Sequence, residues 1–252
     1  MKVPVWQEEI RVKASDVDFR QQMKMTSFFL MMQDVASTHA EHIGYGYYDM
    51  LEKQMAWVMS RIKVRFLRFP QMGETLTVET WPKGVRQKLF FMRDHRMLGA
   101  DGMPVALATT AYVLVGAQAR RILPPSALDV VDPDNDGRHA LDEDLEKILP
   151  VESLEERYVL RAGYSATDIM QHVNNARYIE WIADCFSMEE HAAWHAEWLQ
   201  INFSREVKPG ESVTMLRGQR GDDPQTWYVC GVNQTSNEKA FEAEVHFLDG
   251  NR

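Results

Sequence analysis

This sequence of 252 residues has only two cysteines, no long apolar run and no excess of basic residues. The two cysteines, Cys185 and Cys230, have no C-x-x-C or zinc-like spacing, which argues against a disulfide framework and favours a reducing compartment. No apolar run reaches the roughly 18 uncharged residues that a transmembrane helix needs, so no membrane span is expected. The formal charge of −9 disfavours binding to nucleic acid or to an anionic membrane.

The first residues also lack the apolar segment of a secretory signal, and acidic residues already stand at Glu8 and Glu9. With 45% hydrophobic and 26% charged residues, the composition is that of a globular protein. We therefore expect a cytoplasmic protein.

The negative charge is concentrated in one stretch of the chain. Residues 124–156 contain eleven acidic and two basic residues, four prolines and the turn-forming sequence Asp-Pro-Asp-Asn-Asp-Gly at 132–137. We interpret this stretch as an acidic linker with a short helix near 140–149. It separates an N-terminal domain over residues 1–123, which is net basic, from a C-terminal domain over 157–252.

The two flanking segments repeat each other. A shift of 150 residues aligns Asp18-Phe-Arg-Gln-Gln-Met with Asp168-Ile-Met-Gln-His-Val, and a shift of 137 aligns Gly73-Glu-Thr with Gly210-Glu-Ser. The difference of 13 residues fits a longer connection in the first half. Two copies of one domain explain both matches.

Each copy is predicted to contain an opening strand, a long helix and then four strands. The first helix has Thr26 as a candidate N-cap and Gly44 as a candidate stop, and the second begins at Asn174 or Asn175. The predicted strands cover residues 5–14, 58–67, 74–81, 88–98 and 103–115, then 157–163, 198–207, 211–219, 226–234 and 239–248. The pattern predicts an α+β fold in which each helix is wrapped by its own antiparallel sheet, with the two copies forming a single-chain pseudo-dimer.

The copies differ where chemistry is expected. The C-terminal copy has His172 where the N-terminal copy has Gln22, and Glu206 where the other has Phe69. An imidazole and a carboxylate therefore occur together in one copy only, which favours one active site in the C-terminal domain.

The positions of these residues suggest their roles. His172 precedes a helix whose first N–H groups and positive dipole end can stabilise an oxyanion. Asp168 is four residues earlier and could orient the imidazole, and Glu206 could act as a general base toward water. Taken singly, the His–Asp pair is more often a capping device and Glu206 a surface residue. Their joint occurrence in one copy favours catalysis.

The sequence Asp168-Ile-Met-Gln-His-Val-Asn-Asn-Ala-Arg-Tyr-Ile, with Arg-Glu at 205–206, resembles the acyl-acyl-carrier-protein thioesterases of the plant plastid and bacterial type. The resemblance covers nearly the whole chain and implies two tandem hotdog domains that hydrolyse fatty acyl thioesters of acyl carrier protein in fatty acid biosynthesis. It also implies that Asp168, His172 and Glu206 occupy catalytic positions. We expect no cofactor.

Two departures from the family pattern concern the site. The family usually has Asn where this chain has Met170, and a thioether cannot donate a hydrogen bond, so either Asn174 or a helix N–H replaces it or this protein is slower than its relatives. Val207 follows the glutamate where some plant members have Cys, which excludes a Cys–His mechanism at this position.

The substrate side is predicted to involve the N-terminal domain. Twelve of the 15 methionines precede the linker, and Met31 and Met32 in the first helix are candidates for the wall of an acyl pocket, with core packing as the alternative. The basic residues Arg61, Lys63 and Arg65 share one strand face that could receive acyl carrier protein, or could instead protect a strand edge.

Other motifs carry less weight. His191 and His195 have the spacing of a helical metal pair but lack a zinc signature, and we predict no metal. An acyl-CoA thioesterase, a hotdog dehydratase and a non-catalytic acyl-carrier-binding protein remain as alternative functions. Chain-length preference and further association into a homodimer stay open.

Overall fold

The computed structural model describes residues 3–118, 120–128, 135 and 137–250, and it divides into two compact units, Met1–Leu145 and Glu146–Arg252. Most of the turn predicted at 132–137 lies outside the described residues. Within these residues, no helix is both long enough and apolar enough to span a membrane.

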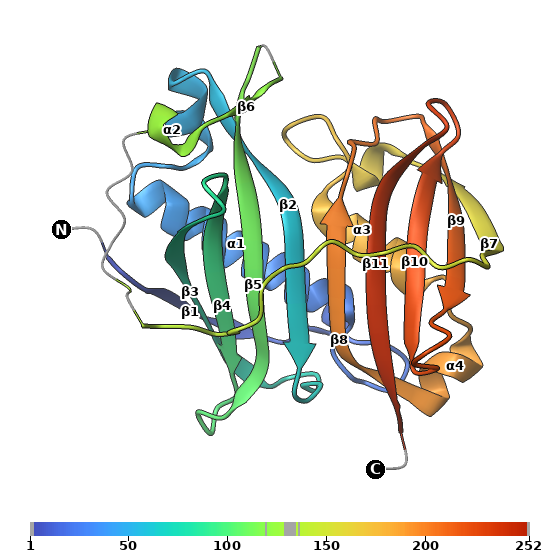
Figure 1. The fold of residues 1–252 in the computed structure, drawn as a ribbon. Coiled ribbons are helices and arrows are strands. Elements are labelled where there is room, and N and C mark those ends of the chain that lie inside the picture. The colour runs from blue at the N-terminus through green and yellow to red at the C-terminus, as the bar shows by residue number, and fades with distance from the viewer. Residues whose placement is uncertain (1–2, 119, 129–134, 136, 251–252) are drawn as a thin grey trace. The chain divides into compact units, whose positions relative to one another are not determined.

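The first unit is a long helix against an antiparallel sheet (Figure 1). The strands run in the order β1-β3-β4-β5-β2, and β6 pairs with β5. Its elements are β1 (Trp6–Arg11), a 3-10 turn (Ala14–Asp16), α1 (Met25–His42), α2 (Tyr47–Glu52), β2 (Met55–Phe66), β3 (Thr75–Arg86), β4 (Phe90–Leu98), β5 (Pro104–Gly116), β6 (Ile122–Leu123) and a second 3-10 turn (Pro125–Ala127).

The second unit repeats this plan with a shorter helix. Its strands run in the order β8-β11-β10-β9-β7, all antiparallel. The elements are β7 (Glu155–Arg161), a 3-10 turn (Tyr164–Ala166), α3 (Asn175–Ala183), α4 (Met188–Ala193), β8 (Trp194–Phe203), β9 (Ser212–Gln219), β10 (Thr226–Asn233) and β11 (Glu238–Asp249). Both units therefore have the predicted α+β hotdog architecture.

The helices pack on the sheets through apolar stripes that the sequence contains. In α1 the buried residues Met25, Phe28, Met32 and Val35 recur at helical spacing. The helix ends as predicted, because Gly44 follows its last turn with a φ of 80°, a left-handed conformation that glycine adopts without strain. Its start differs from the prediction, since the N-cap is Lys24 rather than Thr26.

The second helix begins where the sequence predicts. Asn174 is its N-cap, and the side-chain Oδ1 accepts a hydrogen bond from the Ala176 N–H at 2.9 Å. Tyr178, Ile179 and Ile182 are its most deeply buried large side chains. The ring of Tyr178 packs edge-to-face on Phe203 of β8, as the ring of Phe28 packs on Phe66 of β2.

Two further sequence predictions were wrong. The segment near 140–149 is extended rather than helical. The strand predicted at 198–207 is β8 and covers Trp194–Phe203. Glu206 therefore lies in the connection beyond the strand rather than on it.

The first half of the linker is extended because polar groups of the N-terminal sheet bind its backbone. Lys83 Nζ donates to Leu141 O at 2.6 Å, Trp81 donates to Arg138 O, and the Ala140 N–H donates to Asp94 Oδ2 at 2.7 Å. Of these groups, the Leu141 carbonyl is one that a helix over 140–149 would use for its own hydrogen bonds.

In the C-terminal unit the continuing segment is bound in the same manner. Gln200 and Asn202 donate to Glu146 O, and Arg220 donates to Leu149 O. Ile148 packs in a buried cluster with Tyr228 and Cys230. The linker is thus bonded to both sheets through its backbone as well as connecting the two units.

One of these contacts involves the buried carboxylate of Asp94. Its carboxylate is fully buried, accepts the Ala140 N–H and the Thr109 hydroxyl, and pairs with Lys83 at 3.1 Å. We expect Asp94→Ala to lower the free energy of unfolding by about 3 kcal/mol or more, because Lys83 loses its buried counter-charge. Urea denaturation would measure this. Glu180→Ala, which removes the half-exposed pair with Arg177, is the control and should cost under about 1 kcal/mol.

Buried histidine gives the first unit a predictable pH dependence. His39 is fully buried, bonds Val3 O through Nε2 and Arg93 Nη1 through Nδ1, and burial, then Arg93, lowers its pKa from 6.5 to about 4. The unfolded chain therefore binds a proton between these pH values that the folded chain does not. Stability from this site should be complete above pH 6.5 and fall by on the order of 3 kcal/mol as the pH drops toward 4.

The measurement is urea denaturation at several pH values, with His39→Gln beside the unaltered chain. Glutamine can reproduce one donor and one acceptor but does not titrate, so its slope between pH 6.5 and 4 should be shallower. Equal slopes in the two proteins would contradict the assignment.

Candidate active site

The loops before the two helices have the same backbone structure. In the first unit the Asp18 N–H donates to Gln22 O at 2.8 Å, and in the second the Asp168 N–H donates to His172 O at 2.9 Å. The fourth residue of each loop has a left-handed φ, 62° at Gln21 and 63° at Gln171. The structure therefore places His172 and Gln22 at equivalent positions, as the sequence alignment predicts.

The segments after β2 and β8 are equivalent as well. The Met23 N–H donates to Pro70 O in the first unit, and the Val173 N–H donates to Val207 O in the second. These bonds align residues 70 and 207, so Phe69 and Glu206 are counterparts.

The two candidate residues of the second unit meet. Nε2 of His172 lies 3.0 Å from Oε2 of Glu206, and the side chains are 15% and 40% exposed. The contact joins the loop before α3 to the connection after β8. A half-exposed carboxylate beside an imidazole is accessible to a water and a substrate, which are the reactants of hydrolysis.

The first unit fills the same place with apolar packing. Phe69 stacks on Phe66 with ring centroids 5.4 Å apart and meets Phe28 edge-on at 5.7 Å. No titratable group stands at the positions of His172 and Glu206 in this unit.

Asp168 holds the loop that carries His172. Its Oδ1 accepts the Met170 N–H at 2.9 Å, and its carbonyl accepts the Gln171 N–H at 3.0 Å. Asp18 makes the equivalent side-chain bond to the Arg20 N–H in the unit that lacks the His–Glu pair. The loop-building role of this aspartate therefore does not depend on catalysis. Its predicted orientation of the imidazole stays a prediction.

Asn174 is one of the two groups predicted to replace the asparagine that is absent at position 170. Asn174 uses Oδ1 to cap α3, and the side chain of Met170 is 40% exposed. Because the cap occupies the Ala176 N–H, the N–H of Asn175 is the donor at the start of this helix that the cap leaves.

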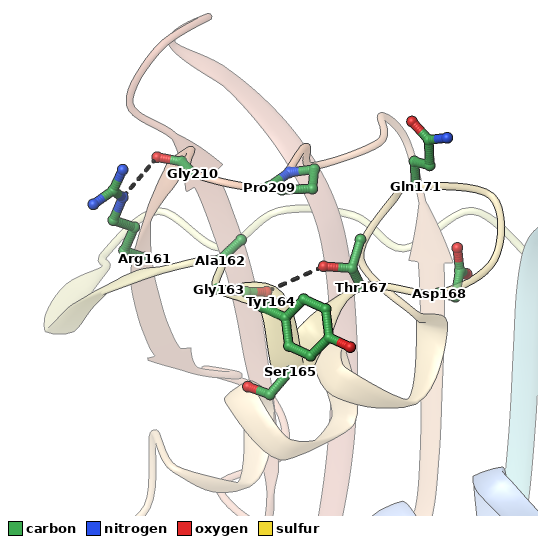
Figure 2. Close-up of a pocket in the computed structure, with 10 residues that line it drawn as sticks. All are labelled: Arg161, Ala162, Gly163, Tyr164, Ser165, Thr167, Asp168, Gln171, Pro209 and Gly210. Carbon is green, nitrogen blue, oxygen red and sulfur yellow. Dashed lines mark hydrogen bonds between the residues drawn. The ribbon is translucent and has the colours of Figure 1, made fainter.

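A pocket of about 830 Å³ adjoins the loop. Figure 2 shows Thr167, Asp168 and Gln171 on one side of it and Pro209 and Gly210 on the other, with the exposed ring of Tyr164 between them. Neither His172 nor Glu206 lines it. The hollow therefore lies beside the loop that carries His172, and the His172–Glu206 contact lies outside its lining.

The methionines predicted to line an acyl pocket are part of the core. Met31 and Met32 of α1 are 7% and 1% exposed. This burial fits the alternative of core packing, and their predicted role in binding substrate stays a prediction.

The basic strand has a partner within the chain. Lys63 and Arg65 both pair with Glu143 of the linker, and Arg61 donates to Leu145 O. The outer face of β2 therefore binds the acidic linker. The predicted role of these three residues in receiving a carrier protein stays a prediction.

The histidine pair does not share a helix. His191 lies in α4 and bonds Ala183 O, whereas His195 lies in β8. Across the described residues, no three side chains of His, Cys, Asp or Glu are grouped as metal ligands.

One contact near the site was not predicted from the sequence. The hydroxyl of Tyr178 accepts a hydrogen bond from the Val207 N–H at 3.3 Å, next to Glu206. The same shift of 150 residues also pairs Phe28 with Tyr178, so the second copy gains a hydroxyl at this position, which is the signal that could have revealed the contact.

Comparison with known families agrees with this geometry. Models of the acyl-ACP thioesterase N-terminal and C-terminal domains match residues 4–127 and 150–248. Together they cover most of the chain, which therefore belongs to the acyl-ACP thioesterase family.

Curated relatives are distant in sequence. A chloroplastic dodecanoyl-[acyl-carrier-protein] hydrolase of Cinnamomum camphora is 25% identical over 215 residues, which are 79% of this chain and 55% of the relative. The chloroplastic oleoyl-acyl carrier protein thioesterase 2 of Arabidopsis thaliana is 22% identical over a match that covers 96% of this chain and 71% of the relative. The chain thus spans from about half to about 70% of the length of these two relatives.

Solved structures share the fold over almost the full chain. An acyl-ACP thioesterase from Bacteroides thetaiotaomicron has a TM-score of 0.83 at 22% identity, covering 97% of this chain and 98% of its own. The 12:0-ACP thioesterase from Umbellularia californica has a TM-score of 0.78 at 19% identity, covering 99% of both chains. These likenesses establish the tandem hotdog fold.

The loop geometry predicts how substitutions of Asp168 affect stability. Asp168→Ala removes the acceptor of the Met170 N–H and should lower the free energy of unfolding by about 1 kcal/mol, whereas Asp168→Asn keeps an oxygen there and should cost less. Chemical denaturation measures both, and Asp18→Ala is the matched control in the other unit. An equal loss for the asparagine and alanine variants would contradict the loop-building role.

Proposed function

We propose that this protein hydrolyses fatty acyl thioesters of acyl carrier protein, releasing the free fatty acid and the carrier. The observation that carries the proposal is the His172–Glu206 contact of 3.0 Å, which stands in one unit of a chain that belongs to the acyl-ACP thioesterase family. The relatives are named as acyl-carrier-protein hydrolases and thioesterases, which supports this choice of carrier.

In the proposed reaction Glu206 is the general base. The carboxylate removes a proton from water as the water oxygen attacks the thioester carbonyl carbon and forms a tetrahedral intermediate. The C–S bond then breaks, and the proton held by Glu206 passes to the departing thiolate. Water is consumed, and a fatty acid and a carrier thiol are formed.

His172 and the start of α3 are proposed to stabilise the oxyanion. In the resting site Nε2 of His172 lies 3.0 Å from Oε2 of Glu206. When Glu206 becomes neutral by protonation, it is a weaker acceptor, so the imidazole N–H can turn to the oxyanion. The Asn175 N–H at the positive end of α3 adds a second donor.

Direct attack by water is favoured over a thioester-linked enzyme. Cys185 and Cys230 are both buried, and burial raises the pKa of the Cys185 thiol to about 12. A protonated, buried thiol is a poor nucleophile. Neither cysteine is adjacent to Glu206, which is followed by Val207.

The decisive experiment measures thiol release from a panel of acyl-acyl-carrier-protein and acyl-CoA substrates. Glu206→Gln should lower kcat about 100-fold or more, because the amide cannot accept the proton, and His172→Ala should lower it to a similar extent. Gln22→Ala, at the position equivalent to His172 in the first unit, is the control and should leave kcat within about twofold.

Other outcomes would refute the site or indicate another function. Undiminished hydrolysis by both site variants would refute the His–Glu assignment. Equal or greater kcat/KM on acyl-CoA would favour a CoA thioesterase, and release of enoyl product from a hydroxyacyl thioester would indicate a dehydratase. No turnover of any substrate by the unaltered chain would favour a protein that only binds the acylated carrier.

A further inference from the structure

The two units differ at the ring that fixes each helix to its sheet. Phe28 in α1 and Tyr178 in α3 occupy equivalent positions and make the same edge-to-face contact, with Phe66 and Phe203 respectively. Tyr178 is 3% exposed and also meets Phe241 edge-on at 5.2 Å. Packing alone would be satisfied by phenylalanine, so the hydroxyl requires a separate explanation.

The hydroxyl binds the segment that carries Glu206. It accepts the Val207 N–H at 3.3 Å, and the carbonyl of the same Val207 accepts the Val173 N–H at 3.1 Å. Val207 immediately follows Glu206, and Val173 immediately follows His172. The two hydrogen bonds of Val207 therefore connect the backbones on which both side chains of the pair depend.

The first unit has neither the donor nor the acceptor of the bond to the ring. Pro70, the counterpart of Val207, has no N–H, and Phe28 has no hydroxyl, although the backbone bond from Met23 to Pro70 is kept. The fold therefore forms without the tyrosine bond. Both of its partners occur in the unit that has the His–Glu pair.

The hydroxyl is suited to a lasting role as acceptor. Burial raises the pKa of Tyr178, and the nearby carboxylates of Glu206 and Asp168 raise it further. The phenol therefore stays neutral, and its ring is held by aromatic contacts on two strands. A rigid, neutral acceptor fixes the backbone beside Glu206 without adding a charge to the site.

We propose that Tyr178 is a positioning residue for Glu206: its hydrogen bond with the Val207 N–H fixes the connection after β8 so that the Glu206 carboxylate stays in contact with His172. This inference rests on the proposed function, since it names the residue that holds the proposed base in place. Tyr178 acts through Glu206 and not on the substrate.

The test is Tyr178→Phe, which introduces the residue that the first unit has at this position. Losing one hydrogen bond that orders the base should lower kcat about 3- to 10-fold, with KM within about twofold. Hydrogen–deuterium exchange of the amides at 204–209 should become faster, because the Val207 N–H loses its acceptor.

Tyr158→Phe is the matched control. Tyr158 also buries most of its ring in this unit and donates its hydroxyl proton to Trp181 O on α3 at 2.7 Å, away from Val207. Its loss should lower the melting temperature by an amount similar to that of Tyr178→Phe. It should leave kcat and exchange at 204–209 unchanged.

The outcomes separate this inference from the proposed function. Hydrolysis that survives Glu206→Gln overturns the proposed base, whatever Tyr178→Phe does. If Glu206→Gln is inactive while Tyr178→Phe keeps the kcat of the unaltered chain, the positioning role alone is refuted. Unchanged exchange at 204–209 in Tyr178→Phe, or an equal loss of kcat in Tyr158→Phe, also overturns it.

Discussion

Burial of one helix against one antiparallel sheet is the constraint on which each unit depends. An aromatic ring in the first turns of the helix, Phe28 or Tyr178, packs edge-on against the last ring of a strand, Phe66 or Phe203. This contact sets the distance between the start of the helix and the end of the strand. The loop before the helix and the connection after the strand therefore meet at a fixed place in both units.

The active site uses that meeting place in one unit only. Backbone hydrogen bonds are the same on both sides of the repeat, so the scaffold does not decide where chemistry occurs. The side chains do: Phe69 packs against Phe66 and Phe28, whereas Glu206 at the equivalent position makes a part-exposed polar contact with His172. A duplicated scaffold allows one copy to specialise in this way while the other keeps the stability of the fold.

Charged and polar contacts bind the linker to the first unit. Its acidic residue Glu143 meets Lys63 and Arg65, and its backbone meets the buried carboxylate of Asp94. The negative charge of the linker and the positive charge of the N-terminal domain, which the sequence shows as separate features, are two sides of one contact. The strand cations consequently take part in the architecture of the first unit.

Local patterns predicted the elements well because helix and strand periodicity are properties of neighbouring residues. The end of α1 at Gly44, the Asn174 cap and nearly all strands are where the sequence predicts them. The helix expected near 140–149 is extended, since its backbone groups bond to side chains far away in the sequence, such as Lys83 and Gln200. Propensity does not contain such partners.

By itself the sequence determined the duplication, the α+β architecture of each copy and the copy that has an imidazole and a carboxylate. The tertiary structure alone decided that His172 and Glu206 lie 3.0 Å apart, that Asp168 builds the loop, and that Arg61, Lys63 and Arg65 bind the linker. It also revealed the bond between Tyr178 and Val207. The reason is physical: residue types and spacing are carried by the chain, whereas hydrogen bonds and ion pairs between distant segments exist only once packing has brought those segments together.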